Sequence, residues 1–229
     1  GNPFNYNTLR KDLIKINQNP DRTSRAVLIP GKKPGETDMI LEVKDRLPVH
    51  IGFDYDTFGS RYIDKQRYSV RFVDNNLLGF DDNLTFQYQL AQAGRYFLKS
   101  TRYLFPLNSG WQIGAFSSFS RVKLGQEFHD SDVRGKSNIY GLFASKSLID
   151  KDNFNLTLNM GFDYKNVTNF QFQRASSEDR LRVSKVGLDF DLTDNLGRTL
   201  LSEEFDYGIP AIMGGLKTRD LSATRDGSG

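Results

Sequence analysis

The chain has 229 residues, of which 38% are hydrophobic and 26% are charged. It contains no run of about 18 or more apolar residues, which excludes a transmembrane helix but leaves a membrane β-barrel open, because barrel strands face lipid only at every second residue. An aromatic content of 13% excludes a disordered chain. The net charge of +3 is too small to indicate a nucleic-acid partner, and the absence of cysteine excludes disulfide scaffolds and thiolate chemistry.

Residues 1–47 predict a small α/β unit. Asn7 is the expected N-cap of a helix that Asn19-Pro20 ends. The helix carries apolar residues at i, i+4 and i+7, namely Leu9, Leu13 and Ile16. Two β-type runs follow, at 23–29 and 37–43, joined by a turn rich in Pro and Gly. Because a unit of this size buries little surface, we expect the rest of it to lie upstream.

From Pro48 onward the apolar period changes to two. Residues 154–164 alternate apolar side chains at even positions with polar side chains or glycine at odd positions, which no helix does. The other predicted strands lie at 49–55, 67–75, 84–90, 96–105, 111–122, 138–149, 186–192 and 200–209. Nine strands of about ten residues, separated by turn signals, predict an antiparallel meander.

Alternation alone does not say which face of such a sheet meets lipid or water. A soluble ligand-binding β-barrel, with Leu156, Leu158 and Phe162 lining its cavity, and a transmembrane barrel with a wet lumen both fit. Two features favour the membrane barrel. The polar face holds Gln, Asn, Thr and Asp, and aromatic residues gather near strand ends as girdles do: Tyr55, Phe58, Tyr62, Tyr96, Tyr103, Phe105, Tyr164, Phe170 and Phe172.

On the membrane interpretation, parity predicts which polar side chains share the lumen-facing surface. These are Gln87, Gln89, Asn155, Thr157, Asn159, Asp163, Asp189 and Asp191. A one-residue bulge would invert this assignment.

No enzyme is expected. His50 and His129 are the only histidines, and neither has a third ligand at a spacing that suits a metal. Ser117, Ser118 and Ser120 lack a nucleophile elbow. Glu203, Glu204 and Asp206 lie near Arg198 in sequence, yet paired-carboxylate catalysis needs a geometry that sequence does not supply. We therefore predict no catalytic, metal or cofactor site.

Three spaced motifs stand out near the N-terminus: residues 16–22 read Ile-Asn-Gln-Asn-Pro-Asp-Arg, residues 29–38 read Ile-Pro-Gly-Lys-Lys-Pro-Gly-Glu-Thr-Asp, and residues 43–48 read Val-Lys-Asp-Arg-Leu-Pro. Together they resemble the end of the last POTRA domain in the ShlB/FhaC/HecB family of two-partner-secretion transporters. Further on, residues 55–59, 75–82, 103–107 and 208–227 are similar to the barrel of that family.

The resemblance implies that residues 1–47 are the C-terminal part of a periplasmic POTRA domain. Residues 48–229 would be the N-terminal portion, about half, of a sixteen-stranded barrel in the bacterial outer membrane. The implied role is haemolysin-type secretion: an unfolded exoprotein binds POTRA modules and passes through the barrel, with outer-membrane lipid outside. A barrel-assembly factor of the related BamA type is the alternative.

Overall fold

The computed structural model describes residues 5–33, 35–107, 110–217 and 221–224. Expected turn residues Pro34, Asn108 and Ser109 lie outside these ranges. The described elements are α1 (Tyr6–Ile16), β1 (Arg22–Pro30), β2 (Thr37–Asp45), β3 (Val49–Asp56), β4 (Arg67–Asp74), β5 (Asn83–Ala91), β6 (Tyr96–Pro106), β7 (Trp111–Lys123), the short 3-10 helix η1 (Gln126–Phe128), β8 (Arg134–Lys151), β9 (Phe154–Gln171), β10 (Arg174–Thr193) and β11 (Arg198–Gly208).

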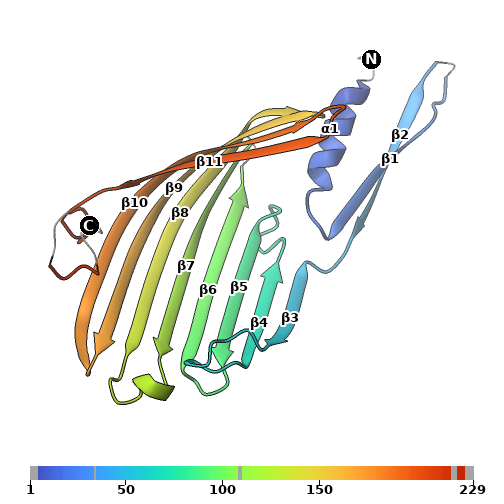
Figure 1. Ribbon diagram of the computed structural model, residues 1–229. Helices are drawn as coiled ribbons and strands as arrows, with labels where there is room; N and C mark the ends of the chain where they lie inside the picture. Colours follow the sequence, from blue (N-terminus) through green and yellow to red (C-terminus); the bar gives the residue numbers. More distant parts are fainter. Residues whose placement is uncertain (1–4, 34, 108–109, 218–220, 225–229) are drawn as a thin grey trace.

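The first unit is a helix beside a two-stranded hairpin, as the sequence predicts (Figure 1). Strand β1 pairs antiparallel with β2, from Arg22 opposite Asp45 to Pro30 opposite Thr37. The predicted helix cap is wrong, because Asn7 already lies within α1. The side chain of Asn5 instead accepts a hydrogen bond from the Thr8 N–H at 3.3 Å.

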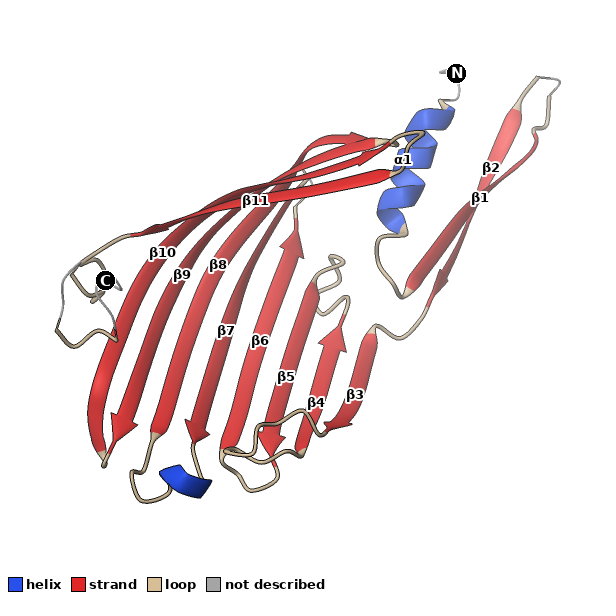
Figure 2. Cartoon of the chain, viewed as in Figure 1, coloured by secondary structure: helices blue, strands red, loops and turns tan. Residues whose placement is uncertain are grey.

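Strands β3 to β11 form one antiparallel sheet in which every strand pairs with its neighbour in sequence (Figure 2). The predicted nine-stranded meander is therefore confirmed. The predicted strand lengths are wrong for β8, β9 and β10, which have 18, 18 and 20 residues. Their additional residues are mostly polar, so they lack the apolar alternation that marks a strand in sequence while still forming ladder hydrogen bonds.

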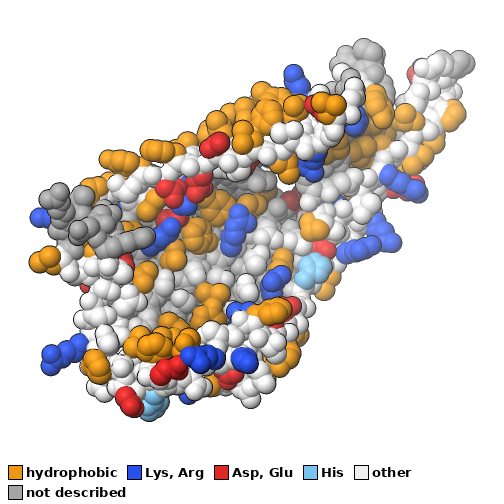
Figure 3. Space-filling view, in the orientation of Figure 1, with side chains coloured by type: hydrophobic (Ala, Val, Ile, Leu, Met, Phe, Trp, Pro, Cys, Tyr) orange, Lys and Arg blue, Asp and Glu red, His pale blue; other side chains and the backbone are white. Residues whose placement is uncertain are grey.

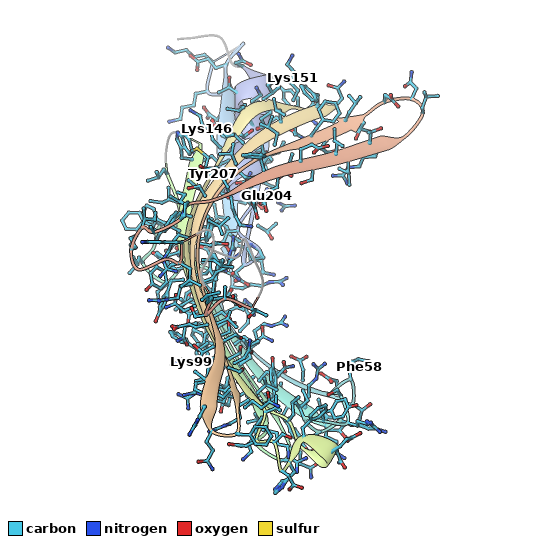
Figure 4. The ribbon with its side chains drawn as sticks, turned by 60° about the vertical axis from the view of Figure 1, so that its left-hand side comes forward. Phe58, Lys99, Lys146, Lys151, Glu204 and Tyr207 are labelled. Carbon is cyan, nitrogen blue, oxygen red and sulfur yellow. The ribbon has the colours of Figure 1, made fainter. Side chains whose placement is uncertain are left out.

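The sheet is curved like a trough, and its two faces differ. Cross-strand partners share a face, so the register assigns every strand residue to one side. Figure 4 shows Lys99 on the convex side and Glu204 on the concave side. The face shared with Lys99 is the apolar one; it includes Phe86, Phe162 and Phe205.

A conventional core is absent from the part of the chain that the structure describes. Ala91 and Leu216 are the only buried apolar residues there, whereas convex residues such as Leu142 and Phe205 are 64% and 70% exposed. A soluble barrel turns its apolar side chains inward, so the ligand cavity that the soluble alternative places around Leu156 and Phe162 is wrong. An exposed apolar surface of this extent is typical of a face that contacts a membrane or another protein.

On the concave face of β7 and β8, two large aromatic rings pack directly over glycines of the neighbouring strand. Phe116 lies opposite Gly141 and Phe143 opposite Gly114 in the register. A Cβ at Gly141 would come 2.1 Å from the Phe116 ring, and one at Gly114 would come 2.4 Å from the Tyr103 carbonyl oxygen. The two rings therefore fill the space that the absent side chains leave.

One aromatic residue of the predicted girdle lies on the wrong face. Tyr96 is paired with Val122 on the concave side, and its hydroxyl donates to Gln89 Oε1 at 3.4 Å. Tyr55 and Tyr164 do lie on the convex face, at opposite wings of the sheet. Alternation within one strand does not fix its faces relative to the next strand, so an aromatic residue at a strand end reveals its face only when the register is known.

The chain after β11 turns back along the free half of β10. The N–H of Ile209 donates to the Arg182 carbonyl, and the N–H of Leu216 donates to the Arg180 carbonyl. Arg182 is 2% exposed, and its guanidinium donates to the carbonyl of Met213 through both Nε and Nη2. This segment thereby satisfies backbone groups that β11 does not reach.

Candidate functional site

All eight side chains predicted for the polar surface lie on the concave face. Six of them gather on β9 and β10, where Asn155 is opposite Asp191 and Thr157 is opposite Asp189. Gln87 and Gln89 share this face but lie on β5, four strands away. The structure thus brings six of the eight together and leaves two on the other wing.

Lysine and carboxylate groups form a network on the same wing. Lys185 Nζ lies 2.9 Å from Glu204 Oε1, 3.4 Å from Asp206 Oδ2 and 3.9 Å from Asp163 Oδ2. Lys165 Nζ lies 2.9 Å from the same Asp163 oxygen. Asp163 is only 6% exposed, so its charge is balanced locally by two lysines rather than by water.

A second group of pairs lies nearer the β10–β11 turn. Asp191 accepts two hydrogen bonds from Arg198, at 2.9 and 2.7 Å, and Asp189 accepts from Asn159 Nδ2 and Ser202 Oγ at 2.6 Å each. Sequence reasoning missed Lys165 and Lys185 as members of this surface. The available signal was their odd parity on strands whose odd positions were already assigned to it.

Figure 3 shows acidic and basic side chains close together within the hollowed face of the molecule, with apolar side chains both among them and along the outer margins. The surface is neither purely acidic nor purely basic. It therefore exerts no strong attraction on a chain of either charge, while β9 and β10 offer hydrogen-bonding groups along it.

A polar junction fixes the first unit to the sheet. Asn19 Nδ2 donates to the Asn75 carbonyl at 3.2 Å and to Asp81 Oδ1 at 2.9 Å. Asp21 accepts hydrogen bonds from Asn75 Nδ2 at 2.7 Å and from His50 Nε2 at 2.9 Å. Both Asn19 and Asp21 are 8% exposed, and they contact β3 and the turn between β4 and β5.

Two further contacts extend this junction. Arg22 bridges Asp81 at 3.0 Å and Asp45 at 2.9 Å, so the hairpin and the turn share one guanidinium. Arg10 on α1 pairs with Asp152 in the β8–β9 turn at 2.8 Å. The first unit is therefore held at two places on the same edge of the trough.

The junction should loosen in acid. The hydrogen bond from Asn75, followed by that from His50, lowers the pKa of Asp21; Arg46 adds a favourable charge. Because this folded-state pKa lies below the ordinary value of about 3.9, the stabilisation is complete above pH ~4 and is lost as pH falls through the lowered value. Spin labels at Met39→Cys and Leu77→Cys should report a constant distance at neutral pH and a broadened one in strong acid.

Asp21→Asn serves as the control for that titration. It should abolish the component of the acid transition that Asp21 contributes, since the amide does not titrate. An unchanged transition in this variant would show that other groups govern it.

No candidate metal site is assembled in residues 5–33, 35–107, 110–217 and 221–224. No three His, Asp or Glu side chains gather there in a way that would hold a metal ion. His50 is engaged by Asp21, and the exposed His129 lies 3.3 Å from Asp130. Glu203 lies opposite Leu188 on the convex face, away from Glu204.

No helix among the described residues is long and apolar enough to cross a membrane.

The fold is similar to those of known outer-membrane barrels. CdiB from Escherichia coli matches with a TM-score of 0.80 at 17% identity, over 95% of this chain and 42% of that one. CdiB from Acinetobacter baumannii gives 0.67 at 14% identity, over 91% and 41%. BamA from Haemophilus ducreyi lacking POTRA domains 1–3 gives 0.52 at 12% identity, over 89% and 42%.

The sequence matches are more specific. The heme/hemopexin transporter protein HuxB of Haemophilus influenzae is 25% identical over 191 residues, which are 82% of this chain and 33% of HuxB. The chain thus spans about a third of that relative. The model of the haemolysin secretion/activation protein family ShlB/FhaC/HecB matches residues 35–211. With its nine-stranded meander and outward apolar face, the chain is part of an outer-membrane β-barrel protein and belongs to the ShlB/FhaC/HecB family.

Proposed function

We propose that this chain is part of an outer-membrane pore that secretes an unfolded exoprotein. Residues 1–47 are the C-terminal part of a periplasmic POTRA domain, and residues 48–229 are the N-terminal portion of the barrel. The concave face lines the lumen, and the convex face contacts outer-membrane lipid. The parent protein moves a chain rather than transforming a substrate, so no residue receives a catalytic role.

The observation that carries this proposal is the contrast between the two faces of one sheet. The concave surface presents amides, hydroxyls and mutually paired charges, such as Lys185 with Glu204 at 2.9 Å. Those groups can exchange hydrogen bonds with the unpaired backbone of an extended chain, and their near balance of charge prevents tight binding. The convex surface has the apolar character that lipid requires.

The hairpin supplies a second argument. Every residue of β2 is exposed, including Met39, Ile40 and Leu41 at 46–48%. Strand β2 pairs only with β1 among the described strands, so one of its edges offers unpaired backbone groups. An extended exoprotein segment could add there as a further strand through main-chain hydrogen bonds.

A BamA-type assembly factor is the alternative, and the similarity to BamA at a TM-score of 0.52 concerns the fold. Secretion and barrel assembly differ in where the protein being handled contacts the barrel. A secreted chain passes along the concave face, whereas a client barrel grows at an open sheet edge.

Cysteine cross-linking in the parent protein tests the proposal, because this chain contains no cysteine of its own. An exoprotein carrying one cysteine and a folded C-terminal block would stall during secretion. Single substitutions Gln87→Cys, Asn159→Cys and Asp189→Cys should form disulfides with it, since these side chains lie on the concave face.

Neighbours on the same strands are the matched controls. Phe86→Cys, Leu158→Cys and Leu188→Cys lie one residue away but on the convex face, and should give no disulfide. Equal cross-linking from both sets would contradict the assignment of the lumen. Cross-links confined to strand edges would support assembly instead.

A further inference from the structure

The convex face changes character at the end of the sheet remote from α1. Two cross-strand pairs of basic residues lie there on β7 and β8: Lys123 opposite Arg134, and Arg121 opposite Lys136. Like charges directly opposite one another destabilise a sheet unless an anion lies between them. Only one of the two pairs has a carboxylate beside it among the described residues.

The outer pair has its own carboxylate. Asp132 lies 3.2 Å from Lys123 Nζ and 2.8 Å from Arg134 Nη2, and it is largely shielded from water. This pair is therefore neutralised from within the loop that joins β7 to β8.

The inner pair has no acidic partner in the described part of the chain. Arg121 and Lys136 are both exposed, and each lies over an aromatic ring: Arg121 5.6 Å from the centroid of Phe97, and Lys136 5.0 Å from that of Phe170. Glu178 occupies the same cross-strand row two strands away, but pairs with Arg180 at 3.7 Å. The rings hold two adjacent cations on a surface that otherwise borders lipid.

An apolar groove of about 660 Å³ lies on the same face, displaced from this pair along β7 and β8 toward the α1 end of the sheet. Its floor consists of small residues, Thr101, Ala115 and Ser117. Met213, from the segment after β11, also lines the groove. The walls are formed by large side chains, namely Tyr103, Tyr140, Leu142, Phe162 and Tyr164.

The spacing suits one amphiphilic molecule. Ser117 is four residues from Arg121 along β7, about 14 Å at 3.4 Å per residue. A long acyl chain spans that distance while its headgroup stays beside the cations. Lys99, one row nearer the groove and opposite Phe119, adds a third basic group.

We propose that the Arg121–Lys136 pair and the groove beneath it bind a phosphorylated lipid of the outer leaflet, of the lipid A class. The phosphate supplies the anion that Asp132 supplies to the neighbouring pair, and one acyl chain occupies the groove. The inference rests on the proposed function, because that orientation places residues 1–47 in the periplasm and this end of the sheet outside.

Retention of lipid A by the purified parent protein tests the site. The protein would be exchanged into phosphatidylcholine nanodiscs containing lipid A, and bound lipid would be counted by native mass spectrometry. Arg121→Gln/Lys136→Gln removes both cations and should reduce retention by at least about tenfold, the effect expected from the loss of even one charge-assisted hydrogen bond. Ser117→Trp, which fills the groove with an apolar side chain, should reduce it while the barrel remains folded.

Lys123→Gln/Arg134→Gln is the matched control, since it removes the same charge from a pair that Asp132 already neutralises, and it should retain lipid A. Three outcomes would overturn the proposal: equal retention by both double variants, equal retention of phosphatidylglycerol, or binding of inorganic phosphate alone. Cross-linking of Asn159→Cys to a stalled exoprotein, measured in the same variants, separates failure of this lipid site from failure of the secretion function.

Discussion

Asn19→Ala is expected to loosen the attachment of the hairpin unit to the barrel while leaving both folded. The Asn19 amide donates across the junction to the Asn75 carbonyl and the Asp81 carboxylate, and it accepts a hydrogen bond from the Asp21 N–H within the first unit. At about 0.5 to 1.5 kcal/mol each, the loss of the two bonds that cross the junction should weaken the coupling between the two parts by roughly 1 to 3 kcal/mol. Spin labels at positions 39 and 77 should therefore report a much broader distance distribution, and secretion by the parent protein should fall.

Asn17→Ala provides a control of the same residue type in the same segment. Asn17 bonds only within the first unit, where its side chain accepts from the Ser24 N–H at 2.6 Å and donates to the Ser24 carbonyl at 3.0 Å. It should alter the hairpin but leave the distance distribution across the junction narrow. Equal broadening in both variants would show that Asn19 acts through local folding rather than through the junction.

The junction also shows what the sequence could not provide. Residues 16–22 were recognisable as a motif, yet the partners of Asn19 and Asp21 in the sheet lie 29 to 62 residues away. A motif identifies residues whose side chains are constrained. Which atoms constrain them depends on how the hairpin is placed against the sheet, and that is a tertiary property.

The polar face was predictable to the extent that period two fixes it. Within β9 the alternation assigns Asn155, Thr157 and Asn159 correctly to one surface, because side chains of a strand alternate strictly. Alternation fails at irregularities: the register shifts between Ser147 and Ile149, so Asp150 returns to the face of Ser147. No composition signal marks that bulge.

Charge partners were the least predictable feature. Lys185 meets Glu204 and Asp163 because β10 lies between β9 and β11 in a specific register, which the turn lengths decide. The sequence shows three charged residues on separate strands. Their neutralisation becomes visible only when the strands are aligned.

Met160→Lys should strongly destabilise the barrel, whereas Asn159→Lys should not. Met160 lies in a convex row that is apolar from β6 to β11, with Phe105, Ile113, Ala144, Val186 and Phe205. A lysine on the lipid-facing surface near the bilayer midplane costs about 2 to 4 kcal/mol. Asn159 is adjacent in sequence but shares the concave face with Asp189, so a lysine there gains a carboxylate partner and stays in a polar surrounding.

The measurement is denaturant unfolding of the parent protein in lipid vesicles, followed by the heat-modifiable shift of the folded barrel on a gel. Met160→Lys should unfold at a clearly lower denaturant concentration than the unsubstituted protein, and Asn159→Lys at nearly the same one. If the two variants changed places, the concave face would be the one that meets lipid. The lumen assignment and the lipid site on the opposite face would then both be wrong, because each depends on the same side of the sheet facing outward.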